Sequence, residues 1–250
     1  MRAVHAEFRK LFTTKTGFLL TLVSVVLSGL LTVLVSVNVS RTDSASDALQ
    51  TIITIGSNFG YLLSAILGII GITGEYRHQT VTPTFLAVPV RSTVVAAKLI
   101  TYLIWGAVLG VLNLIVGLAL ALPLLSNRLV DDVSLSAPGV HTSMWAAIVI
   151  TAVFGIIGVG LGALLRNQVA AIVGLVLYLF IVENVLGAIS AVQSVYKYLP
   201  GALASALTGA VGTPDNIHLL DRTPAALLLV AYGLVFAAIG AAITVSRDVT

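Results

Sequence analysis

The residues of this chain that could carry out chemistry are few and widely spaced. It has no cysteine, which excludes disulfides, cysteine nucleophiles and thiolate metal sites. Its histidines are too far apart in the sequence for a zinc-binding pair. They also lie outside the long apolar runs, so no serine–histidine pair can form within the membrane. These histidines are His5, His78, His141 and His218. The sequence therefore predicts no catalytic residue, no metal and no bound cofactor.

Hydrolysis of ATP by this chain is also excluded by the placement of its lysines. A phosphate-binding loop ends in glycine, lysine and then serine or threonine. None of the lysines follows a glycine; they are Lys10, Lys15, Lys98 and Lys197. We therefore expect that the chain is not an enzyme.

Glu183 is the one charged residue deep in a long apolar run. An ionised carboxylate in hydrocarbon costs about 2.5–3.5 kcal/mol on insertion scales, so the side chain should be protonated, paired or in contact with water. It could lie on a transport pathway or gate, or it could bond a neighbouring helix. The second interpretation is favoured because no coupling ion is otherwise indicated. Asn58 and Asn113 are further pathway candidates, although such residues more often join helices than bind cargo.

The composition indicates that a bundle of membrane-spanning helices must position these side chains. Of 250 residues, 58% are hydrophobic and 9% charged, whereas roughly a quarter of a soluble domain is charged. Six runs are long enough to cross a bilayer as helices. They are Phe18 to Val37, Ile52 to Ile72, Leu99 to Leu122, Trp145 to Leu165, Val169 to Ile189 and Ala225 to Val245. The fold class is therefore all-α, a single six-helix transmembrane domain over residues 1–250. Glycine pairs four residues apart, at 56/60, 106/110 and 158/162, would allow close helix packing.

The distribution of basic residues predicts the orientation. With the N-terminus inside the cell, the cytoplasmic segments hold nine lysines and arginines and the outer segments four. The nine are Arg2, Arg9, Lys10, Lys15, Arg77, Arg91, Lys98, Arg166 and Arg247, and the four are Arg41, Arg128, Lys197 and Arg222. This asymmetry places both termini in the cytoplasm. The dispersed net charge of +3 offers no basic patch, so no nucleic-acid partner is expected.

The N-terminal residues 1–16 have the pattern of an amphipathic helix. Apolar side chains share one face, with basic ones opposite; the apolar set is Val4, Phe8, Leu11 and Phe12, and the basic set is Arg2, Arg9 and Lys10. Such a helix would lie in the headgroup region of the lipid bilayer. The alternative is a basic tail that only fixes the topology.

Residues 193–224 contain a further apolar stretch, Val195 to Gly212. Lys197, Pro200 and Gly201 interrupt it and leave 11 residues, from Ala202 to Gly212, which is short for a crossing. A seventh span is the alternative. We expect instead an outer re-entrant segment between the fifth and sixth spans.

The most polar segment of the chain is "GITGEYRHQTVTPTFLAVPVRSTVVAAKL", Gly71 to Leu99. Thr82 before Pro83 begins a helix and Pro89 ends it, which gives a short helix from Thr82 to Val88 that exposes Phe85 and Leu86. Ser92 is placed to cap the next helix. The cytoplasmic loop 74–98 thus has the shape of a docking element for another protein, or it is an ordinary tight connection whose basic residues only hold the topology.

Two stretches resemble the type-2 ATP-binding-cassette (ABC) permease family. "GEYRHQT" carries Glu75, Tyr76, Arg77 and Thr80 in the pattern that ends the second span in this family, and Lys98 enters the third span as it does there. The second stretch is "ENVLGAISAVQSVYKYLPGALASALTG", with a glutamate in the fifth span and a Tyr-Leu-Pro run before the sixth.

This resemblance implies a bacterial inner-membrane exporter subunit of six spans. It pairs with a second copy or a sister permease, and its first cytoplasmic loop docks as a coupling helix on separate ABC ATPase subunits. The coupling residues would be Glu75, Tyr76, Arg77, Thr80, Thr82, Phe85, Leu86 and Arg91. The ATPase partner would bind ATP and Mg. Because one copy of so apolar a bundle is expected to offer little polar lining, the pathway would lie in the dimer seam.

Two other functions remain open from the sequence. A proton-coupled secondary transporter or channel could use Glu183 as its proton site. A membrane scaffold could depend on helix packing alone and transport nothing.

Overall fold

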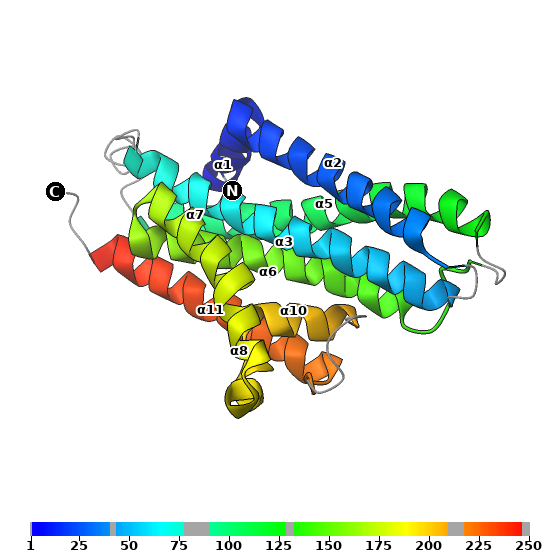
Figure 1. The fold of residues 1–250 in the computed structure, drawn as a ribbon. Coiled ribbons are helices and arrows are strands. Elements are labelled where there is room, and N and C mark those ends of the chain that lie inside the picture. The colour runs from blue at the N-terminus through cyan, green and yellow to red at the C-terminus, as the bar shows by residue number, and fades with distance from the viewer. Residues whose placement is uncertain (1, 41–43, 78–90, 129–132, 210–217, 247–250) are drawn as a thin grey trace.

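The computed structural model of the chain describes residues 2–40, 44–77, 91–128, 133–209 and 218–246 (Figure 1). Every regular element in these ranges is helical, as predicted. The elements are α1 (Arg2–Thr13), α2 (Lys15–Asn38), α3 (Ala45–Arg77), α5 (Arg91–Ser126), α6 (Val140–Leu165), α7 (Gln168–Leu177), a π-helical turn (Tyr178–Val182), α8 (Glu183–Ala188), a 3₁₀ turn (Ser190–Val192), α9 (Gln193–Tyr196), α10 (Pro200–Thr208) and α11 (Arg222–Ser246).

Within the described ranges, six helical stretches are long and apolar enough to span a membrane. They are Lys15–Asn38, Ala45–Arg77, Ser92–Ser126, Val140–Leu165, Gln168–Ala188 and Arg222–Ile243. Each coincides with one of the six predicted runs, which confirms the prediction of a multi-pass membrane protein. The helical form satisfies the backbone hydrogen bonds that hydrocarbon cannot.

The helices extend beyond the apolar runs that predicted them. α3 has 33 residues and is therefore about 50 Å long, more than the roughly 30 Å of the hydrocarbon layer. α5 already includes Arg91, so Ser92 lies inside the helix and the prediction that it caps α5 is wrong. An apolar run marks the part of a helix that is suited to the hydrocarbon layer. The helix itself continues as long as its backbone N–H and C=O groups remain hydrogen-bonded.

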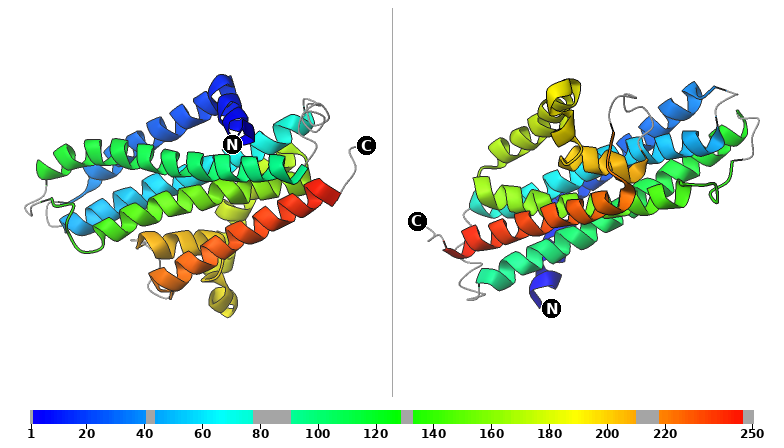
Figure 2. Two further views of the ribbon diagram at one scale, coloured as in Figure 1. Left: turned by 180° about the vertical axis from the view of Figure 1, so that it is seen from behind. Right: turned by 90° about the horizontal axis from the view of Figure 1, so that it is seen from below.

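α6 forms the centre of the bundle, with α3 and α5 packed along it and α11 beside it (Figures 1 and 2). In its most apolar window, 67% of α6 is buried by the rest of the protein, against 17% for α11. All three hydrophobic clusters of the described residues draw on α6 and α3 together, for example around Phe154 and Ile69 in one and around Val159 and Ile72 in another. The peripheral helices α2, α7 and α11 therefore have most of their surface on the outside of the bundle.

Glycines allow α3 and α6 to approach closely. A Cβ added at Gly158 of α6 would collide with the backbone of Ala65 on α3, and one at Gly68 would collide with the backbone of α6 around Gly155. At Gly162, a Cβ would stand 3.1 Å from the Cα of Ile69. The predicted glycine spacing at 158/162 thus lies in a helix contact, which agrees with its expected role in packing.

The fifth span is interrupted in its middle. A π-helical turn, Tyr178–Val182, separates α7 from α8, and the Asn184 amide donates to the carbonyl oxygens of Phe180 and Leu179 at 3.0 and 3.3 Å. Such π turns insert one residue per turn and often occur at functional positions. The turn changes the angular position of Glu183, the first residue of α8, about the helix axis, compared with an uninterrupted α-helix.

After α8 the chain reverses through α9 and returns along α10, beside α6 and α11 (Figures 1 and 2). Pro200 occupies the first turn of α10, where its missing N–H is not needed. α10 has nine residues, too few to cross a bilayer. The described part of Val195 to Gly212 therefore does not form a seventh span. Its position in the outer leaflet stays a prediction.

Several chain ends meet at one end of the bundle, which we call the α1 end. α1, the start of α5, the end of α3 and the last turns of α11 all lie there (Figures 1 and 2). This arrangement follows from six antiparallel crossings, because an even number returns the chain to the side on which it began. The same end holds the charged side chains described next.

Candidate functional site

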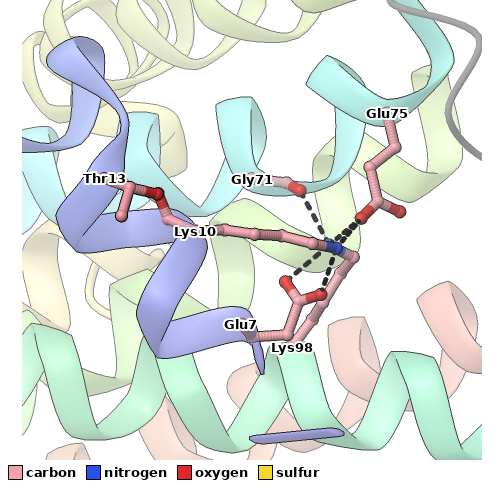
Figure 3. A network of polar contacts seen from close by, with 6 residues as sticks. All are labelled: Glu7, Lys10, Thr13, Gly71, Glu75 and Lys98. Carbon is pink, nitrogen blue, oxygen red and sulfur yellow. Dashed lines mark hydrogen bonds and ion pairs between the residues drawn. The ribbon is translucent and has the colours of Figure 1, made fainter. Parts of the chain in front are cut away.

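A buried lysine lies at the α1 end of the bundle. Lys98 of α5 is only 2% exposed. Its ammonium donates to Glu7 Oε2 at 2.7 Å, to Glu75 Oε1 at 2.8 Å and to the Gly71 carbonyl oxygen at 3.0 Å (Figure 3). Because an ammonium has three N–H donors, Lys98 is fully satisfied by these three acceptors.

A second lysine completes the site. Lys10 of α1 donates to Glu7 Oε1 and to Glu75 Oε1, both at 2.7 Å (Figure 3). Burial lowers the pKa of Lys10, but its hydrogen bonds to Glu7 and Glu75 and their charges outweigh that effect and hold the pKa above its usual value. We call Glu7, Lys10, Glu75 and Lys98 the charge network; it pairs two ammonium groups with two carboxylates from three helices.

The charge network depends on how α1 packs against α5. Leu11 is buried in the cluster that holds Trp105 of α5, and the ring of Phe12 meets the edge of Trp105 with centroids 4.9 Å apart. Of the predicted apolar face, Leu11 is buried and Val4 and Phe8 are half-buried. Phe12 is 64% exposed despite its ring contact. α1 is thus docked on the bundle, while its position in the headgroup region stays a prediction.

Sequence reasoning missed Glu7, although a signal was present. Val4, Glu7 and Leu11 follow one another at intervals of three and four residues, so they share a helix face. An acidic residue inside an apolar stripe calls for a cation on the facing element. Lys98, which the sequence placed at the entrance to the third span, is that cation.

Glu75, a predicted coupling residue, and Lys98, which matches the family at the entrance to the third span, flank the connection between α3 and α5. Glu75 is in the last turns of α3 and Lys98 is in the first turns of α5, and their ion pair holds together the two helices that lead into residues 78–90. Thr80, Thr82, Phe85 and Leu86, and the predicted helix from Thr82 to Val88, lie outside the described residues. Arg91 is at the start of α5.

The remaining coupling residues join α3 to its neighbours. The Arg166 guanidinium lies over the ring of Tyr76, 5.2 Å from its centroid, and donates to the carbonyl oxygen of Ile243 on α11 at 3.3 Å. Arg77 is exposed and lies 3.5 Å from Gln168 Oε1 of α7. Arg166 ends α6 in the left-handed conformation, with φ of 51°, a position that usually requires glycine. The end of α3 is therefore tied to α6, α7 and α11.

The three pathway candidates lie in separate places. Asn113 of α5 is buried and donates to Ser24 Oγ of α2 at 3.1 Å, so it joins two helices as expected. Asn58 of α3 is half-buried. Glu183 is 3% exposed and faces α10 instead. No contact between the described residues joins these three side chains into one site.

Glu183 serves as a remote cap for α10. The backbone N–H of Gly201 donates to Glu183 Oε1 at 3.0 Å. A Cβ at residue 201 would collide with the carboxylate, so Gly201 permits the approach. The positive end of a helix stabilises an anion in this position. The preferred sequence interpretation, a bond to a neighbouring helix, agrees with this geometry.

Replacing Glu183 with alanine is expected to lower the free energy of unfolding by about 0.5–2 kcal/mol, the usual cost of a lost helix cap. The glutamine variant keeps an acceptor oxygen and should lose less. Thermal unfolding of the purified protein in detergent measures both. Asn184→Ala is the matched control, because the Asn184 amide bonds only to carbonyls of its own span. Equal stability of Glu183→Ala and the wild type would contradict the cap.

No model of a known protein family matches the chain, and no curated protein gives a significant match. Among the described residues, no group of three histidine, aspartate or glutamate side chains is placed to hold a metal ion. The charge network joins side chains of α1, α3 and α5, so its bonds hold these three helices together.

Proposed function

We propose that the chain is the transmembrane permease subunit of an ATP-driven ABC exporter, coupled to separate ATPase subunits. In this proposal two copies, or one copy and a sister permease, form the pathway in a bacterial inner membrane. Both termini and the α1 end face the cytoplasm. ATP and Mg are bound by the partner, since none of the lysines of this chain follows a glycine.

The observation that carries the proposal is the clamp between Glu75 and Lys98. A connection that receives force from a motor must have a stiff base, or the displacement is lost in bending. The 2.8 Å ion pair between these two residues provides such a base, and Lys98 is fully buried there, shielded from water and salt. An ordinary tight connection would not need a buried charge at its base.

The contacts of Tyr76, Arg77 and Arg166 support the same function. They join the end of α3 to α6, α7 and α11, so movement of this end would reach most of the bundle. In the proposed cycle, ATP closes the two ATPase subunits and they displace residues 78–90. The clamped ends of α3 and α5 then tilt with their neighbours and open the dimer seam outward.

An ATPase partner should copurify with the protein from its native membrane, and Arg77→Glu should reduce its recovery by at least about tenfold, or about 1.4 kcal/mol of binding. Arg77 is exposed at the α1 end, where a reversed charge would repel an acidic docking surface. Phe85→Glu, outside the described residues, should act in the same way. Quantitative mass spectrometry of the purified complex measures the loss.

Arg128→Glu is the matched control for this experiment. Arg128 is also an exposed arginine, but it follows the opposite end of α5 and donates to the Val37 carbonyl oxygen at 2.6 Å. The Arg128→Glu variant should leave recovery of the ATPase unchanged.

Transport in liposomes that needs no nucleotide would contradict the proposal. Transport that follows a proton gradient and is lost in Glu183→Gln would favour the proton-coupled alternative, whereas normal export by Glu183→Gln would leave Glu183 its capping role only.

A further inference from the structure

The buried face of α2 is polar, although the helix as a whole is strongly apolar. Its inward side carries hydroxyl side chains at every fourth residue, which we call the hydroxyl stripe: Ser24, Ser28, Thr32 and Ser36. Its outward side carries large apolar side chains such as Phe18, Leu22, Val26, Leu30 and Leu34. From Ser24 to Ser36 the stripe extends over 12 residue steps, or about 18 Å of helix, which is more than half of the hydrocarbon thickness.

Polar and small groups also face the stripe from the other helices. A cavity of about 10 Å³ lies there. Its lining includes Ser28 of α2, Gly56 and Ser57 of α3, Asn113 of α5 and Thr151 of α6. This volume is enough for about one water molecule. Every described residue that lines the cavity is uncharged, so a metal cation would find no carboxylate there.

Two hydroxyls of the stripe have no hydrogen-bond partner among the described residues. Ser28 Oγ and Ser36 Oγ are buried without one, and the two residues are 1% and 0% exposed. Ser28 Oγ points toward Gly56, where an added Cβ would lie 3.0 Å away. An unpaired hydroxyl in a dry interior would cost about 1–3 kcal/mol, and lipid offers no partner.

The side chains around Ser28 can accept from or donate to a bridging molecule. The hydroxyls of Ser57 and Thr151 donate to carbonyl oxygens of their own helices at 2.9 and 2.6 Å, which leaves the lone pairs of their oxygens for further bonds. A bridging molecule would therefore have the two to four polar partners that a buried water requires.

We propose that the space between α2 and the bundle is a hydrated site, in which water bonds to Ser28 and bridges it to the hydroxyls of α3 and α6. The sequence led us to expect little polar lining inside one copy, and the hydroxyl stripe is a set of buried polar groups that this expectation did not include. A hydrophilic seam thus runs inside a single chain, apart from any seam between two copies. Its ligand is water, since the volume of about 10 Å³ holds about one such molecule. The inference does not depend on the ATPase partner.

Water-edited solid-state NMR of the full chain in lipid bilayers tests this site directly. Magnetisation transferred from water should reach Ser28 at least about threefold faster than Leu30, its lipid-facing neighbour on the same helix. Ser28→Ala assigns the signal. Build-up at Ser28 no faster than at Leu30 would overturn the proposal, because both side chains would then be equally dry.

A second variant tests where the water lies. Gly56→Ala places a methyl group in the cavity beside Ser28 and should abolish the fast transfer to Ser28. Gly174→Ala is the matched control, since an added Cβ there meets nothing within 4 Å, and it should leave the transfer unchanged. Fast transfer that survives Gly56→Ala would show that the water is elsewhere and would overturn the assignment of this cavity.

Discussion

Replacing Lys98 with methionine is expected to lower the free energy of unfolding by about 3–5 kcal/mol, the cost of leaving buried charges unpaired. Methionine has a similar length but no charge, so the carboxylates of Glu7 and Glu75 would lose their buried partner. For a chain of this size the melting temperature should fall by roughly 6–20 °C. Thermal unfolding in detergent, followed by intrinsic fluorescence, measures this shift.

Two variants of the same network serve as controls. Lys10→Met removes the other ammonium, but the Lys10 side chain is 48% exposed, so its loss should cost no more than about 1 kcal/mol. The triple change Glu7→Gln, Glu75→Gln and Lys98→Met leaves only the half-exposed Lys10 ammonium without a carboxylate, so it removes the buried unpaired charges and should recover most of the stability. If Lys98→Met proves as mild as Lys10→Met, water reaches the two carboxylates and the network is not a buried clamp.

Replacing Gly158 with alanine is expected to destabilise the bundle by about 1–3 kcal/mol, because the added methyl group would be forced into a filled contact. At this position the Cβ meets the backbone of Ala65, which cannot rotate away as a flexible side chain would. Gly158→Leu should prevent α3 and α6 from packing and reduce the yield of folded protein. Size-exclusion profiles and thermal unfolding after expression measure both effects.

Gly174→Ala provides the comparison for Gly158→Ala. It makes the same chemical change in a helix, but with open space around the added methyl group. Alanine favours a helix over glycine by up to about 1 kcal/mol, so this variant should be neutral or slightly stabilised. Destabilisation of both variants by the same amount would mean that the cost is not due to the contact with Ala65.

Six spans could be predicted from the sequence because crossing a bilayer requires long apolar runs. The ends of the helices could not, since side-chain hydropathy does not report where backbone hydrogen bonding stops. Hydropathy also concealed the inner face of α2. The apolar side chains around Leu30 dominate the average, while Ser28, two residues earlier, points inward.

The candidate site was partly visible in the sequence. Glu75 and Lys98 were expected near the loop, but Glu7 was not, because its partner is 91 residues away and only the packing of α1 on α5 brings the two together. Glu183 was recognised as unusual, but its acceptor role could not be derived. It depends on the chain returning through α9, so that Gly201 presents its N–H to the carboxylate.

α5 runs for 36 residues from its charged base to Ser126, a length of about 54 Å. Such a rod acts as a lever when it tilts about its charged base. A tilt of about 5° at the base would carry the opposite tip through about 5 Å over that length. In the proposed transport cycle, a small displacement near Lys98 would therefore become a larger displacement at the opposite end of α5, in proportion to the length of this helix.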